Sequence, residues 1–406
     1  MLFIPREPTA SGVPKVYPHT LTGQFLEKYE VEQVYHVDEM VVVLEKFCPS
    51  VILTLAGTNR SSGVQLKKTE FPRMELFKIN TDVLYPAMTK CRMIKTSHEL
   101  EIMTSANDIT VDAHRHVMQR SRPGMTEFQC EALYFQYMRY VAGCTQEAHQ
   151  PVFASGKNVA FLRHGQGAAL KIKKILPGEL CLLNTAVSYC GYTADIVTTF
   201  PASGKFSPHQ AAVYEAVLAT QSAVLSCVRP GVTWASLERV AARTLLDALV
   251  RIGIVTGTVE DMVEAGIADV FHLMDLGHSV GIDAHDVTDG GLVLEEGMVL
   301  AVGPGCLFND VVLDRALRHP LQSKFLVADV VQKFRSMGGA RVQDNVVVTS
   351  TGAVNLTKLP RSVDDVEECM KRSRAFRCDS TPIESFLENF KTTAPRHSNF
   401  VSVNLV

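Results

Sequence analysis

The chain has 406 residues, of which 46% are hydrophobic and 20% charged, and its formal net charge at pH 7 is −3. These values are typical of a globular protein with a sizeable core, and the length favours two domains. The small net charge gives no electrostatic reason to expect nucleic acid or an anionic membrane as a partner. Because no apolar run reaches the ~18 residues of a spanning helix, we expect no membrane segment.

The cysteines and the first residues predict where the protein resides. Ten cysteines are scattered along the chain without a CxxC pair. Several stand in apolar runs, such as Cys181 in "LCLL". Disulfides in a secreted protein are the alternative, but buried thiols in a reducing compartment fit this distribution better. The opening "MLFIPREPTASGV" is too short in its apolar stretch for a signal peptide, so we expect a cytoplasmic protein.

The first ninety residues alternate short apolar runs with loops. "MVVVLEKF" (40–47) predicts the end of a helix, and "SVILTLAG" (50–57) predicts a buried strand. "NRSSG" (59–63) is a turn or loop by composition.

A long helix is predicted over residues 95–120. It opens with a capping box formed by Thr96 and Glu99 and continues with apolar residues at helical spacing. We place the domain boundary just before it. The predicted organisation is an N-terminal domain over 1–92, a second domain over 93–374 and a C-terminal tail over 375–406.

A weak internal repeat lies within the second domain. Residues 121–143 and 228–253 each contain Arg-Pro-Gly, an apolar residue and a Thr that can cap the amphipathic helix after it. A chance match of one tripeptide is the alternative. Because each copy also follows another helix, the repeat favours a pseudo-twofold α+β domain with helices packed over a shared sheet.

Several polar side chains interrupt runs that otherwise read as strands. Asn184 ends the apolar run "LCLLN", and Asp195 lies in the next strand-like stretch. His278 and His285 stand between glycines in "DLGHSVGIDAHD". Gln343 falls in a predicted strand within "GGARVQDNVVVTS".

A glycine occurs where another strand should continue. "GMVLAVGPGCLF" (297–308) begins as an apolar run that suits a strand covered on both faces. Gly303 then interrupts it, at a cost in packing and backbone entropy. A side chain is missing at this position.

The chain resembles the prolidases, the Xaa-Pro dipeptidases of the pita-bread metallopeptidase family, which also includes methionine aminopeptidase and aminopeptidase P. The likeness runs from about Leu2 to about Arg374. It is carried by the stretches "LFIPR", "CRMIKTSHELEIM", "TADIVTTFPASGKFSPHQAAVYEAVL", "LGHSVGIDAHDV", "EEGMVLAVGPG" and "GGARVQDNVVVT". It implies a pita-bread (creatinase/aminopeptidase) α+β fold behind a smaller, truncated N-terminal α/β domain.

The resemblance also implies a metal site whose ligands are mostly replaced. Such enzymes hold two divalent ions with two Asp, one His and two Glu, and use a bridging water as nucleophile. Asp195 and His278 retain two of these ligands. Asn184, Gly303 and Gln343 stand where the other three carboxylates belong. One carboxylate would therefore face two dications that four carboxylates balance in the family.

The substrate side departs from the family as well. Arg163 stands where a pocket histidine belongs, with His164 one position later. Met274 replaces another histidine. His285 and Arg341 match family residues that line the pocket and are kept. The segment after His285 lacks the arginine-bearing insertion with which prolidases grip the carboxylate of a dipeptide.

Other interpretations of these residues remain open. Asp195 and His278 form either a hydrogen-bonded buried pair or ligands of one weakly held metal ion. Asn184 and Gln343 need no function as interior amides. Arg163 either lies on a solvated loop or pairs with Asp195 or an anion. Asp275, next to Met274, is a weak candidate for a replacement ligand.

Three functions follow from this interpretation. The leading hypothesis is a pseudoenzyme that has lost dinuclear catalysis and that binds peptides or regulates a partner. For this pseudoenzyme we expect no cofactor. The first alternative is an active Xaa-Pro dipeptidase or aminopeptidase with a rebuilt single-metal site, dependent on manganese or another divalent ion. The second is a metal-free, creatinase-like hydrolase.

We expect a homodimer or association with an active prolidase chain. The tail segment "IESFLENF" is either a docking helix or part of a loosely ordered terminus.

Overall fold

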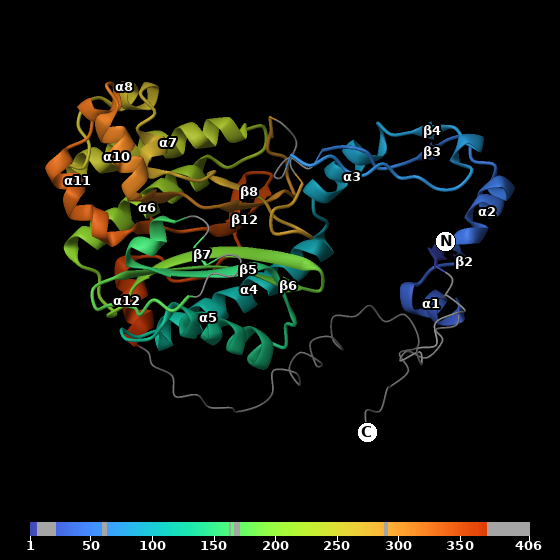
Figure 1. Cartoon of the computed structure of the whole chain (residues 1–406), viewed down its shortest axis with the longest axis horizontal. Helices are drawn as coiled ribbons and strands as arrows, with labels where there is room; N and C mark the ends of the chain where they lie inside the picture. The colour runs from blue at the N-terminus through green and yellow to red at the C-terminus, as the bar shows by residue number, and fades with distance from the viewer. Residues whose placement is uncertain (6–21, 59–62, 162–163, 166–170, 288–290, 372–406) are drawn as a thin grey trace. The chain divides into compact units, whose positions relative to one another are not determined.

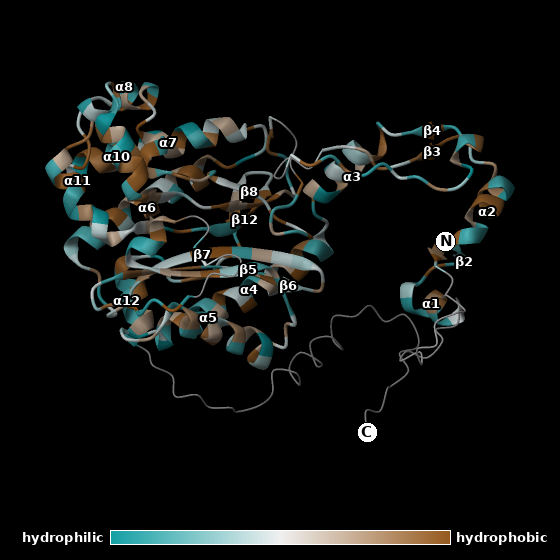
Figure 2. Cartoon of the chain, in the orientation of Figure 1, coloured by the Kyte–Doolittle hydropathy of each residue, from teal (hydrophilic) through white to brown (hydrophobic). Residues whose placement is uncertain are grey.

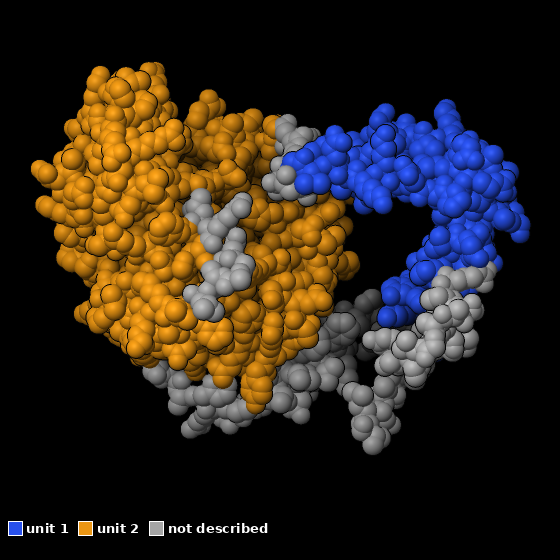
Figure 3. Space-filling model, in the orientation of Figure 1, with its two compact units in different colours: residues 1–90 blue, residues 91–406 orange. Residues whose placement is uncertain are grey.

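Two compact units make up the chain. The computed structural model describes residues 1–5, 22–58, 63–161, 164–165, 171–287 and 291–371 (Figure 1). Contacts within the chain separate residues 1–90 from residues 91–406, as Figure 3 shows by colour. The tail over 375–406, with its predicted docking helix, lies outside the described residues, as does Arg163.

The first unit consists of short elements. In chain order they are β1 (Leu2–Ile4), α1 (Thr22–Tyr29), β2 (Val34–His36), α2 (Met40–Phe47), β3 (Ile52–Leu53), β4 (Ile79–Asn80) and the start of α3 (Leu84–Met93). Strands β1 and β2 pair in parallel, and so do β3 and β4. The helix predicted over 40–47 is confirmed. The buried strand predicted over 50–57 is wrong: only two residues pair, and Leu53 is 40% exposed, because β4 offers an equally short partner.

The second unit contains the longer helices and sheets. Its first half comprises α4 (Ser97–Arg120), α5 (Glu127–Phe135), β5 (Gln146–Ser155), β6 (Leu180–Tyr189) and β7 (Tyr192–Pro201). Its second half comprises α6 (Pro208–Cys227), α7 (Trp234–Ile252), α8 (Val259–Glu264), α9 (Ala268–Phe271), β8 (Gly277–Ser279), β9 (Val299–Val302), β10 (Gly305–Leu307), α10 (Asp310–Arg318), α11 (Ala328–Phe334), β11 (Gly339–Arg341), β12 (Asp344–Thr349), β13 (Gly352–Asn355) and α12 (Val363–Lys371).

Capping residues set the beginnings of the helices. The predicted capping box of α4 is present: Thr96 Oγ1 accepts from the backbone N–H of Glu99, and the Glu99 carboxylate accepts from that of Thr96. The threonines of the repeat lie at matching positions. Thr126 caps α5 with its side chain, and Thr233 precedes α7 without a side-chain capping bond. The repeat therefore marks the start of the second helix in each pair.

Two antiparallel sheets lie under these helices and meet at one point. The first has the order β5-β6-β7, and the second β13-β12-β9-β8. Helix α4 packs against β6 and β7, while α6 contacts β10, β11 and β13. The sheets join through a bridge in which the backbones of Val197 and Gln343 exchange hydrogen bonds of 3.2 and 3.1 Å. This junction positions the polar residues of the candidate site.

The core of the second unit lies between its helices and the first sheet. Its large buried side chains include Tyr134, Phe153, Phe200, Tyr214 and Phe271, each less than 2% exposed. Figure 2 shows hydrophobic and hydrophilic positions side by side on helices such as α7 and α11, as expected where one face meets a core. Among the described residues, no helix is long and apolar enough to cross a membrane.

Candidate metal centre

A single buried carboxylate forms the centre of the site. Asp195 lies on β7, opposite Ala186 of β6, and is 2% exposed. Its Oδ2 lies 3.2 Å from Nε2 of His278, which belongs to β8 in the other sheet. The pair expected from the sequence is therefore present, and it spans the junction of the two sheets.

Two further histidines adjoin this pair. The ring of His285 stacks on that of His278 with centroids 3.9 Å apart. Ligand atoms of Asp195, His278 and His285 all lie within 4.8 Å of one another. On the other side, Nε2 of His149, on β5, lies 3.4 Å from Oδ1 of Asp195. One carboxylate thus lies among three imidazoles.

The electrostatics of the site favour an ionised Asp195. Burial alone would raise the pKa of its carboxyl, but His149 and His278 outweigh that effect and hold the pKa well below its usual value. Burial lowers the pKa of His149, yet the bonded carboxylate raises it further, so the net shift is upward. Burial and the neighbouring His278 lower the pKa of His285 to about 4, which leaves His285 neutral at pH 7.

Gly303 marks a break between two strands. Strand β9 ends at Val302 and β10 begins at Gly305, so the strand expected over 297–308 divides at the glycine. A Cβ built on Gly303 would lie 2.5 Å from Oε1 and 2.9 Å from Cβ of Gln343. The Gln343 side chain therefore fills the space that a glutamate at 303 would need.

Gln343 and Arg341 bond to each other and to the backbone. Gln343 is fully buried between β11 and β12, where its Nε2 donates to the carbonyl of Asp195 at 3.1 Å. Its Oε1 accepts from Nη2 of Arg341 at 2.5 Å, and Nε of Arg341 donates to the carbonyl of Gly303 at 3.1 Å. Arg341, expected to line the substrate pocket, is 6% exposed and makes these inward bonds.

Asn184 differs from Gln343 in its bonding. It lies on β6 opposite Val152 and Val197. Its Oδ1 is buried and has no hydrogen-bond partner among the described residues. A buried carbonyl oxygen without a partner costs free energy, which a bound cation or water would offset.

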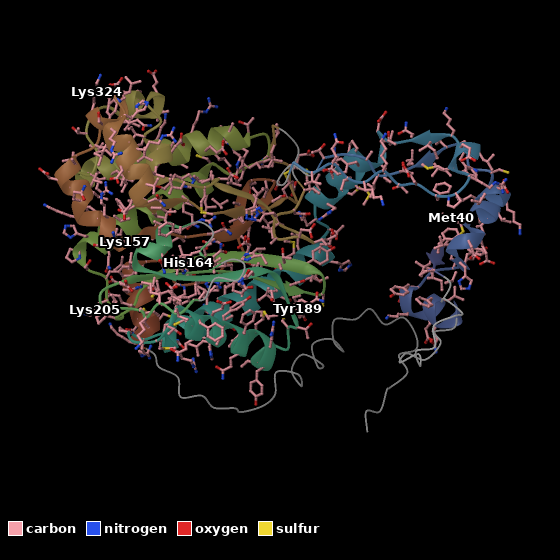
Figure 4. All side chains as sticks on the ribbon, viewed as in Figure 1. Met40, Lys157, His164, Tyr189, Lys205 and Lys324 are labelled. Carbon is pink, nitrogen blue, oxygen red and sulfur yellow. The ribbon has the colours of Figure 1, made fainter. Side chains whose placement is uncertain are left out.

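The histidine beside Arg163 lies in another network. Nε2 of His164, labelled in Figure 4, lies 2.7 Å from Oε2 of Glu127, at the start of α5. Glu127 is fully buried and also accepts from Ser155 and Asn158. The structure therefore places His164, expected in the substrate pocket, in a hydrogen-bonded contact with Glu127 near the end of β5.

Met274 and Asp275 line a cavity of about 250 Å³ together with residues of α7 and α9. The cavity also contacts Pro304, directly after Gly303. Burial and the carboxylate of Asp275 raise the pKa of Glu238, a residue of α7 that also lines the cavity. Asp275 thus faces α7, and the His–Asp cluster does not include it among the described residues.

The described residues offer the ligands of one divalent ion. Asp195, His278 and His285 offer one carboxylate and two imidazoles at mutual distances that an ion can bridge. Asp344, also buried, is paired with Arg361 and is not part of this cluster. Two dications beside one carboxylate would leave a large uncompensated buried charge.

Two joined sheets covered by helices, with a His–Asp cluster at their junction, are typical of one class of protein. This class is the pita-bread α+β metallopeptidase domain. A model of metallopeptidase family M24 matches residues 101–350. Human Xaa-Pro dipeptidase is 39% identical over 388 residues, which cover 91% of this chain and 78% of the human protein. A probable Xaa-Pro aminopeptidase of Paracoccidioides brasiliensis is 30% identical over 90% of this chain and 81% of its own. The chain belongs to metallopeptidase family M24.

Solved structures agree with this assignment. Aminopeptidase PepP of Pseudomonas aeruginosa superimposes with a TM-score of 0.71 at 25% identity, covering 87% of this chain and 78% of its own. Proline aminopeptidase P II of Yersinia pestis gives a TM-score of 0.70 at 27% identity, with 86% and 78% covered. The pita-bread fold expected from the sequence is confirmed.

The sequence pattern did not identify His149 as a residue of the site. Its stretch, "QEAHQPVFAS", carries no metal-binding spacing. The histidine reaches Asp195 because both residues pair with Ala186, across which their longer side chains meet. Only the order of the three strands reveals this proximity.

Proposed function

We propose that this chain is a metal-dependent Xaa-Pro peptidase whose site holds one divalent ion in place of two. The cluster of Asp195, His278 and His285 carries the proposal, since their ligand atoms lie within 4.8 Å of one another. A divalent ion supplies Lewis-acid polarisation of a scissile carbonyl. The names of the relatives, Xaa-Pro dipeptidase and Xaa-Pro aminopeptidase, support the substrate class.

The remaining side chains have distinct parts in this proposal. Asp195 supplies the one negative charge, and His278 and His285 supply neutral nitrogen ligands. Asn184 offers a buried oxygen without a partner among the described residues. Arg341 and Gln343 bond to each other, and Gln343 also bonds to the backbone of Asp195, so they support the position of the carboxylate.

The test is hydrolysis of a Gly-Pro dipeptide by protein treated with chelator and reloaded with manganese or zinc. We expect turnover to depend on the ion and to fall at least ~100-fold in Asp195→Asn, which keeps the side-chain volume. Asp247→Asn, in an exposed pair with Arg251, is the matched control. Turnover that persists in chelator, or in Asp195→Asn, would contradict the proposal.

A second candidate is a non-catalytic, peptide-binding role. One observation favours it: the space of the missing Glu at position 303 is filled by Gln343, so the dinuclear arrangement is closed off. Binding of a Gly-Pro dipeptide to metal-loaded protein without hydrolysis would support this role. The metal-free, creatinase-like hypothesis depends on the position of Arg163, outside the described residues, and stays a prediction.

We further propose that the chain pairs through its first unit, with a second copy or with a related prolidase chain. Exposed apolar side chains support this pairing, among them Phe47, Val64 and Leu76, which are 52–63% exposed in the single chain. Light scattering should show a dimer, or pull-down should show a prolidase-type partner. A stable monomer without such a partner would contradict it.

A reducing compartment such as the cytoplasm is also part of the proposal. Cysteines in the described part of the chain are free thiols, including the exposed Cys48, Cys91 and Cys190. Thiol titration of the denatured protein should report ten free thiols per chain, the full number in the sequence. A lower value after purification under non-oxidising conditions would contradict it.

A further inference from the structure

Exposed apolar side chains gather beside the start of α5. Residues 171–176 run antiparallel to the segment that leads into this helix, through a bridge between Thr126 and Lys174. The burial alternates, so Ile172, Lys174 and Leu176 are exposed while the residues between them are buried or half-buried. Ile172 is 70% and Leu176 55% exposed. From Ile172 to Leu176 the exposed row extends for about 13 Å, because each extended residue advances ~3.3 Å.

Phe128 widens this row into a patch. Its backbone N–H donates to the carbonyl of Lys171 at 2.9 Å, which places it next to Ile172, and it is 63% exposed. We call Phe128, Ile172 and Leu176 the α5 patch. Lys174 lies in the middle of the patch and is exposed as well. Neighbouring apolar side chains exposed to this degree mark a surface that binds another segment or protein.

One segment outside the described residues matches the α5 patch in its pattern. Residues 381–390 are "TPIESFLENF". Thr381 and Glu384 have the spacing of a capping box, and Pro382 stands at the first helical position, so the sequence predicts a helix that begins here. Apolar residues follow at helical spacing, at positions 383, 386, 387 and 390. This apolar face is about 10 Å long at 1.5 Å per residue, close to the length of the patch.

The charges of the two surfaces are complementary. Glu384 and Glu388 are four residues apart, so both lie on one flank of the predicted apolar face. Lys174 lies between Ile172 and Leu176 in the row of exposed side chains. A helix laid along the α5 patch would therefore bring carboxylates to the ammonium group while its apolar face covers the apolar side chains.

The chain can bring this segment to the patch. Helices α5 and α12 both pack against α4 (Figure 1). Close to the end of α12, Sγ of Cys369 lies 4.0 Å from Nε2 of Gln119. Gln119 is five residues, or about 18 Å at most, from Gly124, whose N–H donates to the backbone of residues 171–176. Residues 372–380 span about 30 Å when extended, which is sufficient.

We propose that residues 381–390 dock as an amphipathic helix on the α5 patch of the same chain. A tethered segment has an effective concentration on the order of millimolar at a surface that its linker can reach, which favours it over a separate partner. The docking is independent of the proposed peptidase activity, so either proposal can fail alone.

Cross-linking of the full chain with a carbodiimide, which joins a lysine directly to a carboxylate, tests this docking. We expect an amide between Lys174 and Glu384 or Glu388, identified by mass spectrometry of the digested protein. A mixture of unlabelled and heavy-isotope-labelled chains shows whether each link lies within one chain. Ile172→Ser and Phe386→Ser should each lower the yield of the link about fivefold or more, because each removes apolar contact.

Val311→Ser is the matched control, because Val311 is 73% exposed on a different helix, α10, and the yield should not change. Trypsin gives a second measurement: cleavage after Lys391, relative to cleavage after Arg377 in the linker, should be several-fold faster in Phe386→Ser than in the parent. Links only between differently labelled chains would assign the α5 patch to a second copy and overturn docking within one chain. A parent without the link, or Ile172→Ser with parental link yield and trypsin ratio, would overturn it as well.

Discussion

The side chain of Gln343 fills the space next to Gly303. A side chain at position 303 would therefore collide with the one at position 343. A Cβ at 303 would lie 2.5 Å from Oε1 of Gln343, a distance that real Cβ atoms essentially never show. Arg341 bonds to both residues, to the carbonyl of Gly303 and to Oε1 of Gln343. The three form one packed unit at the position of the missing carboxylates.

Gly303→Ala should therefore destabilise the protein. We expect a loss of about 1–3 kcal/mol in the free energy of unfolding, typical of overpacking in a dense interior. The double variant with Gln343→Ala should lose less than the sum of the single changes, because the steric conflict is partly removed. Urea unfolding measures the cycle. Gly352→Ala is the control, since its nearest atom beyond the chain neighbours lies at 3.9 Å; additive single effects would refute the coupling.

Restoring the missing carboxylates should restore a second metal position. In the triple variant Asn184→Asp, Gly303→Glu and Gln343→Glu, we expect more bound manganese than in any single variant, because bridging ligands help only when both ions are present. In chelator the melting temperature should fall below that of the parent, since four carboxylates then repel one another and the Glu at 303 crowds the equally large side chain at 343. Added manganese should raise it. Binding no greater than that of the parent would show that the residue correspondence is wrong.

Arg341 should act on stability more than on substrate binding. Arg341→Met removes the donors to Gly303 and Gln343 and leaves two buried acceptors unsatisfied, at a cost of about 2–4 kcal/mol. Arg341→Lys should rescue only part of this, because an ammonium cannot reproduce the two-pronged geometry. Urea unfolding and dipeptide binding are measured together. A Met variant of parental stability that no longer binds the dipeptide would place Arg341 in the substrate pocket instead.

Acid should destabilise the protein partly through His114, a buried histidine on α4. Its nitrogens each lie 2.9 Å from a threonine hydroxyl, those of Thr198 and Thr185, and burial lowers its pKa to about 3. The unfolded chain takes up this proton near pH 6.5, so the contribution is complete above that pH and declines as pH falls toward 3. We expect His114→Gln to be less stable at pH 7 but to lose less between pH 7 and pH 5. An unchanged pH dependence of unfolding would exclude this cause.

Local patterns in the sequence predicted much of the second unit. The capping box of Thr96 and Glu99 and the paired Arg-Pro-Gly turns act within a few residues, so they identify helix starts before any tertiary contact is known. The interruption at Gly303 likewise predicted a gap in a strand. The short strand β3 was overestimated because its extent depends on its distant partner β4.

The site was predictable only where each residue carried its own signal. Asp195 and His278 were recognised in their motifs, and the structure brings them together. The sequence could not show that the side chain of Gln343 occupies the space beside Gly303, because this depends on packing between strands. His149 reaches Asp195 through the pairing order of β5, β6 and β7, which no pattern in the sequence specifies. The contact of His164 with Glu127 likewise depends on tertiary packing that no local pattern specifies.

The number of tightly bound divalent ions per chain is the most direct test of a site built on Asp195, His278 and His285. Elemental analysis of purified protein, reloaded with excess zinc or manganese and dialysed, measures it. We predict one ion per chain in the parent and none in Asp195→Asn. Two tightly bound ions in the parent, or none, would contradict a single-ion centre.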